Sequence, residues 1–229
     1  MKITKYLSRL AEKRTRNVLA IIVMFACTSI CFGMITKLDA SNATDGRNVG
    51  GNFANPNGTG PFSKNPSKCT LIVNQGAIVK GASGARIDDI SDFVSMTDNK
   101  IFVEGGDFSN GNISGACSLS GNNVDVSNNI VEINAGNDTR SDVGGHTRNG
   151  TAFRNSVFGG LVVGNGNANN NKVIINDKRI KGHVFGGCVF GNGNANNNEV
   201  TIKGGRIEGG VFGGCVIGDG NANNNEVTI

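Results

Sequence analysis

A 27-residue unit is written almost three times between residues 157 and 229, and this repetition constrains the fold more than any other feature of the chain. The copies read VFGGLVVGNGNANNNKVIINDKRIKGH (157–183), VFGGCVFGNGNANNNEVTIKGGRIEGG (184–210) and VFGGCVIGDGNANNNEVTI (211–229). The second and third copies are identical at 17 of their 19 shared positions. Self-similarity at a fixed period of this size is typical of solenoids, in which each unit stacks on its neighbours.

Each unit predicts short strands separated by polar corners. In NEVTI (198–202) the apolar residues Val200 and Ile202 alternate with polar ones, as in a strand with one buried face. VFGGCVFG (184–191) and the weaker GRIEG (205–209) are the other expected strands. Because glycine costs about 1 kcal/mol per helical position, the frequent Gly and Asn residues disfavour a helix. We therefore expect an all-β chain that forms a right-handed parallel β-helix, a β-solenoid with one 27-residue unit per turn.

Residues one period apart in such a solenoid lie above one another in columns. Stacked apolar residues fill the core, and stacked asparagines at corners can hydrogen-bond from turn to turn and tolerate positive φ. The predicted structural columns are Val173, Val200 and Val227; Leu161, Cys188 and Cys215; and Asn167, Asn194 and Asn221.

The same register extends towards the amino terminus. NKIFVEGGDF (99–108) aligns with NEVTIKGGRI (198–207), and ISGAC (113–117) aligns with VFGGC (211–215). The first strand positions of successive turns are then Leu71, Ile101, Val131, Val173, Val200 and Val227, at spacings of 30, 30, 42, 27 and 27 residues. The longest step contains a polar, glycine-rich insertion at about 136–154, which we expect to form a loop. The sequence thus predicts degenerate turns over 69–156 and regular repeats over 157–229.

The first 43 residues have the pattern of an export signal. Six basic residues and one acidic residue in 1–17 precede an uncharged apolar stretch at 18–36, which we expect to be helical. Small residues at 41 and 43 predict cleavage after Ala43, with cleavage after Ala40 as an alternative. An uncleaved membrane anchor stays open, because about 19 apolar residues approach the length that spans a bilayer.

The residues that follow the signal differ from it in composition and in net charge. Residues 44–68 hold all three prolines among Gly and Asn, and we expect a flexible lead-in or a cap over the first turn. The signal carries a net charge of +5 through residue 43 and the remaining chain −1, so the basic pI belongs to the signal. No nucleic-acid partner is therefore expected.

The four cysteines after the signal do not predict a metal site. Cys188 and Cys215 are expected to be buried thiols, because stacked Cβ atoms hold the sulfurs in poor disulfide geometry. Cys69 and Cys117 could form a disulfide in an oxidising compartment. A zinc site is not expected, since the chain has no CxxC and both histidines, His146 and His183, are isolated in loops where solvation is the usual state.

Neither calcium binding nor catalysis is favoured by the repeats. GNGNANNN resembles a calcium-binding nonapeptide, but asparagine stands where carboxylate ligands are needed. The repeat carboxylates are scattered, and the stack of Glu199 on Glu226 is interpreted as a solvated face. We predict no catalytic residue, no cofactor and no metal ligand. A calcium-stabilised repeat, or a glycan hydrolase or lyase that uses the 136–154 loop, is the alternative.

The motif VFGG–(C/L)–x–x–G–(N/D)–G–N–A–N–N–N–x–V–x–I, followed by a return to VFGG, resembles the repeat-rich passengers of bacterial autotransporters. Together with the basic export signal, this resemblance covers about 99–229. It implies an exported protein that passes through the inner-membrane export machinery and a transient periplasmic stage, to the cell surface, the outer membrane or the extracellular space. It also implies an adhesin-like or stalk role, a host or surface glycan or protein as ligand, and a carboxy-terminal outer-membrane barrel. Since no barrel strands occur and the sequence ends within a strand at Ile229, we expect an amino-terminal fragment.

Overall fold

The computed structural model describes residues 35–38, 48–50, 67–74, 78–79, 81–87, 94–105, 107–108, 111–119, 123–134 and 156–229. The chain forms two units, Met1–Phe32 and Gly33–Ile229, and every described residue lies in the second. All regular elements in the described residues are β-strands. No helix long and apolar enough to cross a membrane occurs among them. Most of the predicted signal, most of the 44–68 lead-in and the 136–154 loop lie outside the described residues.

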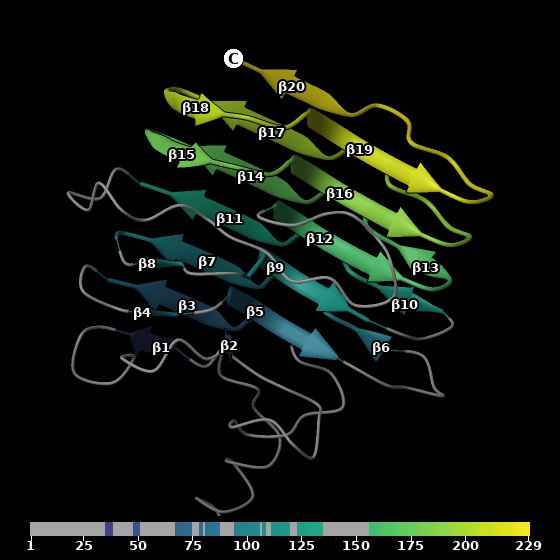
Figure 1. The fold of residues 1–229 in the computed structure, drawn as a ribbon. Coiled ribbons are helices and arrows are strands. Elements are labelled where there is room, and N and C mark those ends of the chain that lie inside the picture. Colours follow the sequence, from purple (N-terminus) through teal and green to yellow (C-terminus); the bar gives the residue numbers. More distant parts are fainter. Residues whose placement is uncertain are drawn as a thin grey trace, which may run out of the picture. The chain divides into compact units, whose positions relative to one another are not determined.

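The strands form parallel sheets that wind into a β-solenoid, as the repeat predicts (Figure 1). One sheet contains, in order, β1 (Ile35–Leu38), β3 (Thr70–Val73), β7 (Lys100–Val103), β11 (Ile130–Ile133), β14 (Lys172–Ile175), β17 (Glu199–Ile202) and β20 (Glu226–Thr228). A second contains β2 (Asn48–Gly50), β5 (Gly81–Ile87), β9 (Ile113–Ser118), β12 (Val157–Val163), β16 (Val184–Phe190) and β19 (Val211–Ile217). Each strand therefore pairs with its equivalent one turn away.

Shorter strands complete the turns. A third sheet contains β6 (Val94–Ser95), β10 (Val124–Asp125) and β13 (Gly166–Asn167). Two further pairs are β4 (Ile78–Val79) with β8 (Asp107–Phe108), and β15 (Lys178–Ile180) with β18 (Gly205–Ile207). Some strands fall in segments for which no strand is predicted: β1 lies within the predicted signal, β2 within the predicted lead-in and β13 within a predicted polar corner.

The register of the seven-stranded sheet passes directly across the longest step. Val131 pairs with Ile101 on one side and with Val173, 42 residues later, on the other. Val173 pairs in turn with Val200, and Val200 with Val227. The insertion between β11 and β12 therefore adds no strand to this sheet and does not shift its register.

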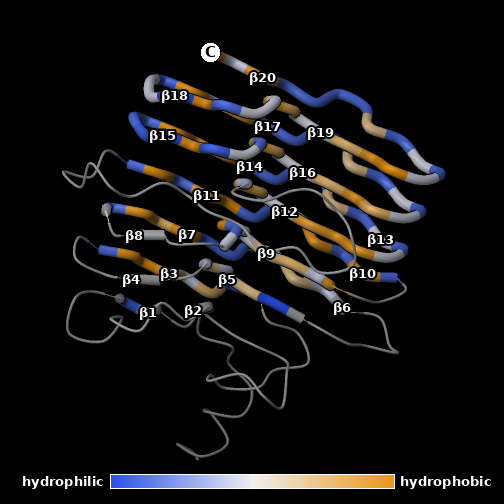
Figure 2. The backbone as a smooth tube through the Cα atoms, in the orientation of Figure 1, coloured by the Kyte–Doolittle hydropathy of each residue, from blue (hydrophilic) through white to orange (hydrophobic). Residues whose placement is uncertain are grey.

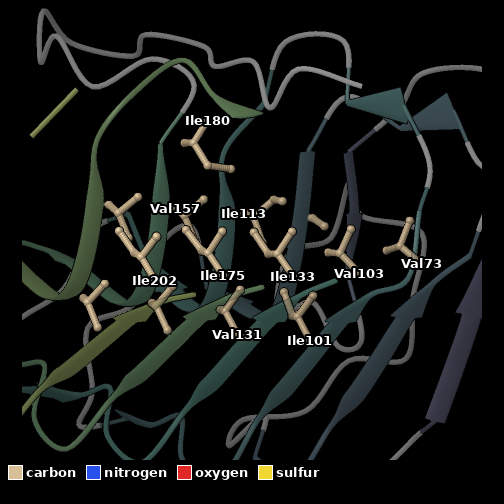
Figure 3. Close-up of a cluster of buried hydrophobic side chains, with 14 of the residues drawn as sticks. Val73, Ile101, Val103, Ile113, Val131, Ile133, Val157, Ile175, Ile180 and Ile202 are labelled. Carbon is tan, nitrogen blue, oxygen red and sulfur yellow. The ribbon is translucent and has the colours of Figure 1, made fainter. Parts of the chain in front are cut away.

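The core follows from this stacking. In β14 and β17 the alternate residues Val173, Ile175, Val200 and Ile202 are buried, as expected for strands with one face inward. Equivalent valines and isoleucines from successive strands form one continuous apolar cluster (Figure 3). Along the backbone, apolar stretches on the strands alternate with polar corners (Figure 2).

Two of the strands that begin with VFGG, β12 and β16, are buried on both faces, which the sequence analysis did not predict. Val157 and Val162 belong to the inner clusters, whereas Phe158 and Leu161 belong to a separate buried cluster with Phe185 and its neighbours. A short continuous apolar run is typical of a strand that is covered on both sides. The run VFGGLVV carries that signal.

The first glycine of VFGG allows the turns to approach closely. A Cβ at Gly159 would lie 2.9 Å from the Cβ of Asn171 and closer still to the carbonyl oxygen of Gly186 in the next turn. The equivalent glycines in the neighbouring turns, Gly115 and Gly186, have the same surroundings. Since real Cβ atoms do not approach other atoms so closely, this column requires glycine at every turn.

In the seven-stranded sheet, the residue two positions before each of the strands β3, β7, β11, β14, β17 and β20 adopts a left-handed backbone conformation. The residues there are Lys68 (φ 61°), Asp98 (60°), Asn128 (59°), Asn170 (55°), Asn197 (55°) and Asn224 (53°). Asparagine and aspartate visit this region more readily than other non-glycine residues. This preference explains why asparagine occupies the second-last position of NANNN in the repeats, at Asn170, Asn197 and Asn224.

Lys68 holds the same left-handed conformation without that preference, so Lys68→Gly is expected to stabilise the protein. The left-handed conformation costs a residue with a Cβ roughly 1–2 kcal/mol, and glycine removes this cost at some loss of chain entropy, for a net gain of about 0.5–1 kcal/mol. Urea unfolding of the parent protein and of Lys68→Gly measures the difference in their free energies of unfolding. Lys100→Gly, within strand β7, serves as the control and should destabilise by about 0.5–1 kcal/mol. Equal losses at both positions would contradict the prediction.

Candidate functional site

The structure places the predicted columns on different parts of each turn. Val173, Val200 and Val227 lie in the seven-stranded sheet, at the inward-facing position of β14, β17 and β20. Leu161 pairs with Cys188, and Cys188 with Cys215, in the six-stranded sheet. The asparagine column lies at the corner that follows this sheet. These columns lie in different sheets and clusters, and the features repeated on every turn are the candidate functional surface.

The predicted asparagine column forms a hydrogen-bonded ladder, here called the outer ladder (Asn167, Asn194 and Asn221). The backbone N–H and the Nδ2 of Asn194 both donate to Oδ1 of Asn167, at 3.1 Å. Asn221 donates in the same way to Oδ1 of Asn194, at 3.3 Å. Asn194 and Asn221 therefore both donate towards the preceding turn.

Two neighbouring columns flank the outer ladder and are partly or fully exposed. The backbone N–H of Asn192 donates to Oδ1 of Asn165 (3.2 Å), and that of Asp219 donates to Oδ1 of Asn192 (3.1 Å). In the other column, the backbone N–H of Asn196 donates to Oδ1 of Asn169 (2.8 Å) and that of Asn223 to Oδ1 of Asn196 (2.7 Å). The corner thus presents three parallel rows of amides, and Asp219 is the one acidic side chain in them.

A second ladder, buried and absent from the sequence predictions, runs through the solenoid. This core ladder consists of Asn99, Asn129, Asn171, Asn198 and Asn225. Asn99, Asn129, Asn171 and Asn198 are at most 1% exposed. Each is the last residue before an alternating apolar strand, and this position is the signal that could have identified the ladder.

The core ladder runs in the opposite direction to the outer one. Nδ2 of Asn129 donates to Oδ1 of Asn171 (3.0 Å), and Nδ2 of Asn171 donates to Oδ1 of Asn198 (3.1 Å). The backbone N–H groups of Asn129 and Asn171 donate to the same oxygens. Nδ2 of Asn171 also donates to the carbonyl of Val126 (2.9 Å). Nδ2 of Asn129 likewise donates to the carbonyl of Met96 (3.0 Å). Each of these two amides therefore bonds to the following turn and to the corner of the preceding turn.

Charged side chains gather on the seven-stranded sheet and on the β15–β18 pair. Nζ of Lys172 lies 2.6 Å from Oε1 of Glu199, and this ion pair, formed by residues in paired positions, lowers the pKa of the Glu199 carboxyl. Glu199 also pairs in register with Glu226. The interpretation of Glu199 and Glu226 as a purely solvated stack is therefore incomplete. On β15, Arg179 lies 2.6 Å from Glu208.

His183 has specific partners, contrary to the expectation that it is simply solvated. Its Nδ1 accepts a hydrogen bond from the backbone N–H of Gly210 (2.8 Å), one turn later. Its ring also lies against Phe185 and Phe212. His183 therefore joins two turns, while His146 lies outside the described residues.

All four cysteines of the described residues are in the thiol form. Cys69 precedes β3 of one sheet and Cys117 lies in β9 of another. Cys188 and Cys215 are neighbours on paired strands, and the S–H of Cys188 donates to the sulfur of Cys215. This hydrogen bond lowers the pKa of Cys215 to about 7 and, with burial, raises that of Cys188.

Cys215 is therefore expected to be alkylated well below the pH at which an ordinary thiol reacts. Because the thiolate is the nucleophile, the rate of reaction with iodoacetamide should rise with a midpoint near pH 7. Cys188→Ala removes the donor and should move the midpoint up towards the usual thiol value. Mass spectrometry of peptides from a pH series locates the alkylated cysteine. An unchanged midpoint in the variant would contradict the assignment.

No metal centre is formed within the part of the chain that the structure describes: no three or more His, Cys, Asp or Glu side chains gather there in an arrangement that could hold an ion. Comparison with known proteins finds no matching family model, no matching curated protein and no matching solved structure. The functional argument therefore rests on the residues of this chain.

Proposed function

We propose that the protein is an exported, cell-surface β-solenoid with a structural stalk or adhesin-like role and no catalytic activity. The observation that carries the proposal is the repeated outer surface: three rows of amides recur at the same place on successive turns. Apart from Asp219, such a surface offers repeated, uncharged amide contacts. Weak contacts that repeat at fixed spacing give strong overall binding through avidity.

The repeats also suit a spacer of adjustable length. Strands β14, β17 and β20, and β12, β16 and β19, pair in unbroken register, so an added turn lengthens the rod without changing its cross-section. We infer a right-handed winding, because parallel strands joined by a crossover take that hand in nearly all proteins. The basic and apolar segments at 1–36 support export to the surface.

Export and adhesion are tested separately. The chain is expressed in a diderm bacterium with an outer-membrane barrel fused to its carboxy terminus, and the mature protein is expected to begin at Thr44 and to be digested by protease added outside the cells. A product that retains Met1 and resists external protease would contradict the proposed localisation. Beads coated with the full chain and applied to glycan-coated and protein-coated surfaces then distinguish an adhesin from a stalk, because only an adhesin retains the beads.

A further inference from the structure

The basic residues of the chain are concentrated on the strand pair β15 and β18, which lie side by side (Figure 1). Residues 176–183 and 203–210 contain five of the fifteen basic residues that follow the predicted signal, and only two of the sixteen acidic ones. Their net charge is +3, whereas the whole chain after residue 43 has a net charge of −1. The rest of that chain is therefore acidic, and a polyanion is attracted to this part of it.

Four of these basic side chains are here called the cationic edge (Arg179, Lys181, Lys203 and Arg206). Arg179 pairs in register with Arg206 on the neighbouring parallel strand. A single carboxylate, Glu208, lies among them, and its pKa is lowered by the hydrogen bond from Arg179 and by the charges of Arg179, Arg206 and Lys181. Three cations therefore act on one carboxylate, and the group keeps an excess of positive charge.

The edge is exposed in a turn that has a neighbour stacked on it. Arg179 keeps 49% of its side chain exposed although β18 pairs with β15, and Lys181 is exposed as well. Ile180, between them, is fully buried in the apolar core. Because side chains alternate between the two faces of a strand, Arg206 faces outward like its paired residue Arg179. The exposure of the edge thus follows from the direction of its side chains.

The arginines of the edge already bind a carboxylate of this chain. Oε1 of Glu208 accepts hydrogen bonds from Nε and Nη2 of Arg179, at 3.1 and 2.6 Å. Nε of Arg206 lies 3.5 Å from the same oxygen. Two arginines from successive turns therefore converge on one carboxylate oxygen. Because each guanidinium has five N–H donors in a planar fork, one carboxylate does not use all the donors of two arginines.

The spacing of the arginines suits an extended polymer with an anionic group on each unit. Paired positions on neighbouring parallel strands lie about 4.7–4.9 Å apart. One sugar residue of an extended glycan has about the same length. A carboxylated glycan laid across the strands can therefore bring carboxylates to Arg179 and Arg206 together, and contacts on successive turns reinforce one another.

The edge lacks the side chains that a membrane or a nucleic-acid surface would add. Its apolar residues, Ile180 and Ile207, belong to the core cluster or pack against it, so they do not supply the apolar contact that accompanies basic residues in stable membrane binding. Residues 176–182 and 203–209 contain no aromatic residue on which a base could stack. An acidic glycan needs neither feature.

We propose that the cationic edge is a binding site for an acidic polysaccharide, whose carboxylates bind Arg179 and Arg206 across two turns. The three amide rows contain no basic residue, so this site is distinct from them and depends on charge. The attraction for a polyanion rests on the edge alone. The choice of a glycan as its source rests on the proposed cell-surface role.

The test compares two forms of one polymer. The full chain is applied to immobilised polygalacturonate, a linear chain of carboxylated sugars, and to its methyl ester, in which the same backbone is uncharged. Biolayer interferometry at low salt should show binding to the acid that is roughly tenfold tighter or more. Binding to the acid should be lost near about 1 M salt, where exposed charges are screened.

Matched variants locate the site, because residues 1–17 are also basic and are the same in every protein compared. Arg206→Gln should weaken binding to polygalacturonate about threefold, and the double variant with Arg179→Gln about tenfold. Lys100→Gln removes the same charge from an exposed position of β7, in another sheet. It should change the affinity by less than about 1.5-fold.

Glu208→Gln should have the opposite effect. It removes the carboxylate that competes for both arginines and should strengthen binding about threefold, a gain that misfolding does not produce. Glu104→Gln adds the same charge at an exposed position after β7 and should have less than half of this effect. Equal gains from the two variants would contradict a local site.

Other results would also overturn the proposal. Equal losses in Arg206→Gln and Lys100→Gln would show that the total charge of the chain attracts the polymer. Equal binding to polygalacturonate and its methyl ester would show that no anion site exists. Tighter, Arg206-dependent binding to phosphatidylglycerol vesicles or to single-stranded DNA would assign the edge to a membrane or to a nucleic acid. These measurements use purified protein, so their failure and a failure of surface export are distinguishable.

Discussion

Gly159→Ala is expected to destabilise the protein by about 4 kcal/mol or more, which is exceptional for the addition of one methyl group. The new Cβ would collide with the backbone oxygen of Gly186 and with the Cβ of Asn171, 2.9 Å away. Both atoms belong to buried, hydrogen-bonded parts of the solenoid, so neither can move without separating two turns. Urea unfolding monitored by circular dichroism measures the loss.

Gly210→Ala is the matched control for this prediction. A Cβ there would meet chiefly the ring of Phe212, at 2.6 and 2.8 Å, and that ring is 42% exposed and can rotate away. We expect a cost of about 1 kcal/mol or less. Similar losses in both variants would mean that the close approach of the turns at Gly159 does not determine the result.

Asn171→Ala is expected to cost about 2–4 kcal/mol, the second largest effect. Its Oδ1 accepts from the backbone N–H and the Nδ2 of Asn129, both at 3.0 Å, and its Nδ2 donates to Val126 and to Asn198. The alanine leaves both Asn129 donors buried without that acceptor. A buried donor that loses its partner costs more than the net value of the bond itself.

Asn194→Ala provides the comparison within the same residue type. Asn194 also lies between two ladder asparagines and accepts from a backbone N–H and an Nδ2, but its partner Asn221 is exposed. Water can replace the lost bonds there, so the expected cost is below about 1 kcal/mol. Chemical unfolding of the two variants gives the difference directly, and equal costs would show that burial does not determine the strength of the ladders.

Much of the fold could be predicted because the same pattern of apolar and polar residues occurs in every copy of the repeat. Period-two alternation at Val200 and Ile202, written again at each copy, predicts the parallel strands and the β-solenoid that the structure confirms. Upstream, Ile101 and Val131 carry the same alternation although the surrounding turns are degenerate. Strand pairing depends on this apolar pattern more than on the loops between strands.

Residue type alone does not separate the core ladder from the corner, and only the position directly before an alternating apolar strand marks it. Asn197 and Asn198 are adjacent and identical, yet Asn197 adopts the left-handed conformation and Asn198 turns its amide into the core. Both roles favour asparagine, so composition does not distinguish them. The same difficulty applies to VFGG, where an apolar run predicts a strand but does not show which faces are covered.

The opposite directions of the two asparagine ladders have an electrostatic consequence. A column of aligned amides adds its dipoles, as the peptide groups of a helix do, and the sum would grow with every turn. Here the side chain of Asn171 points its N–H groups towards the following turn and that of Asn194 towards the preceding one. The two columns therefore oppose each other, and added turns contribute little net dipole from their ladders. A solenoid of this cross-section can grow long without accumulating opposite partial charges at its two ends from these side chains.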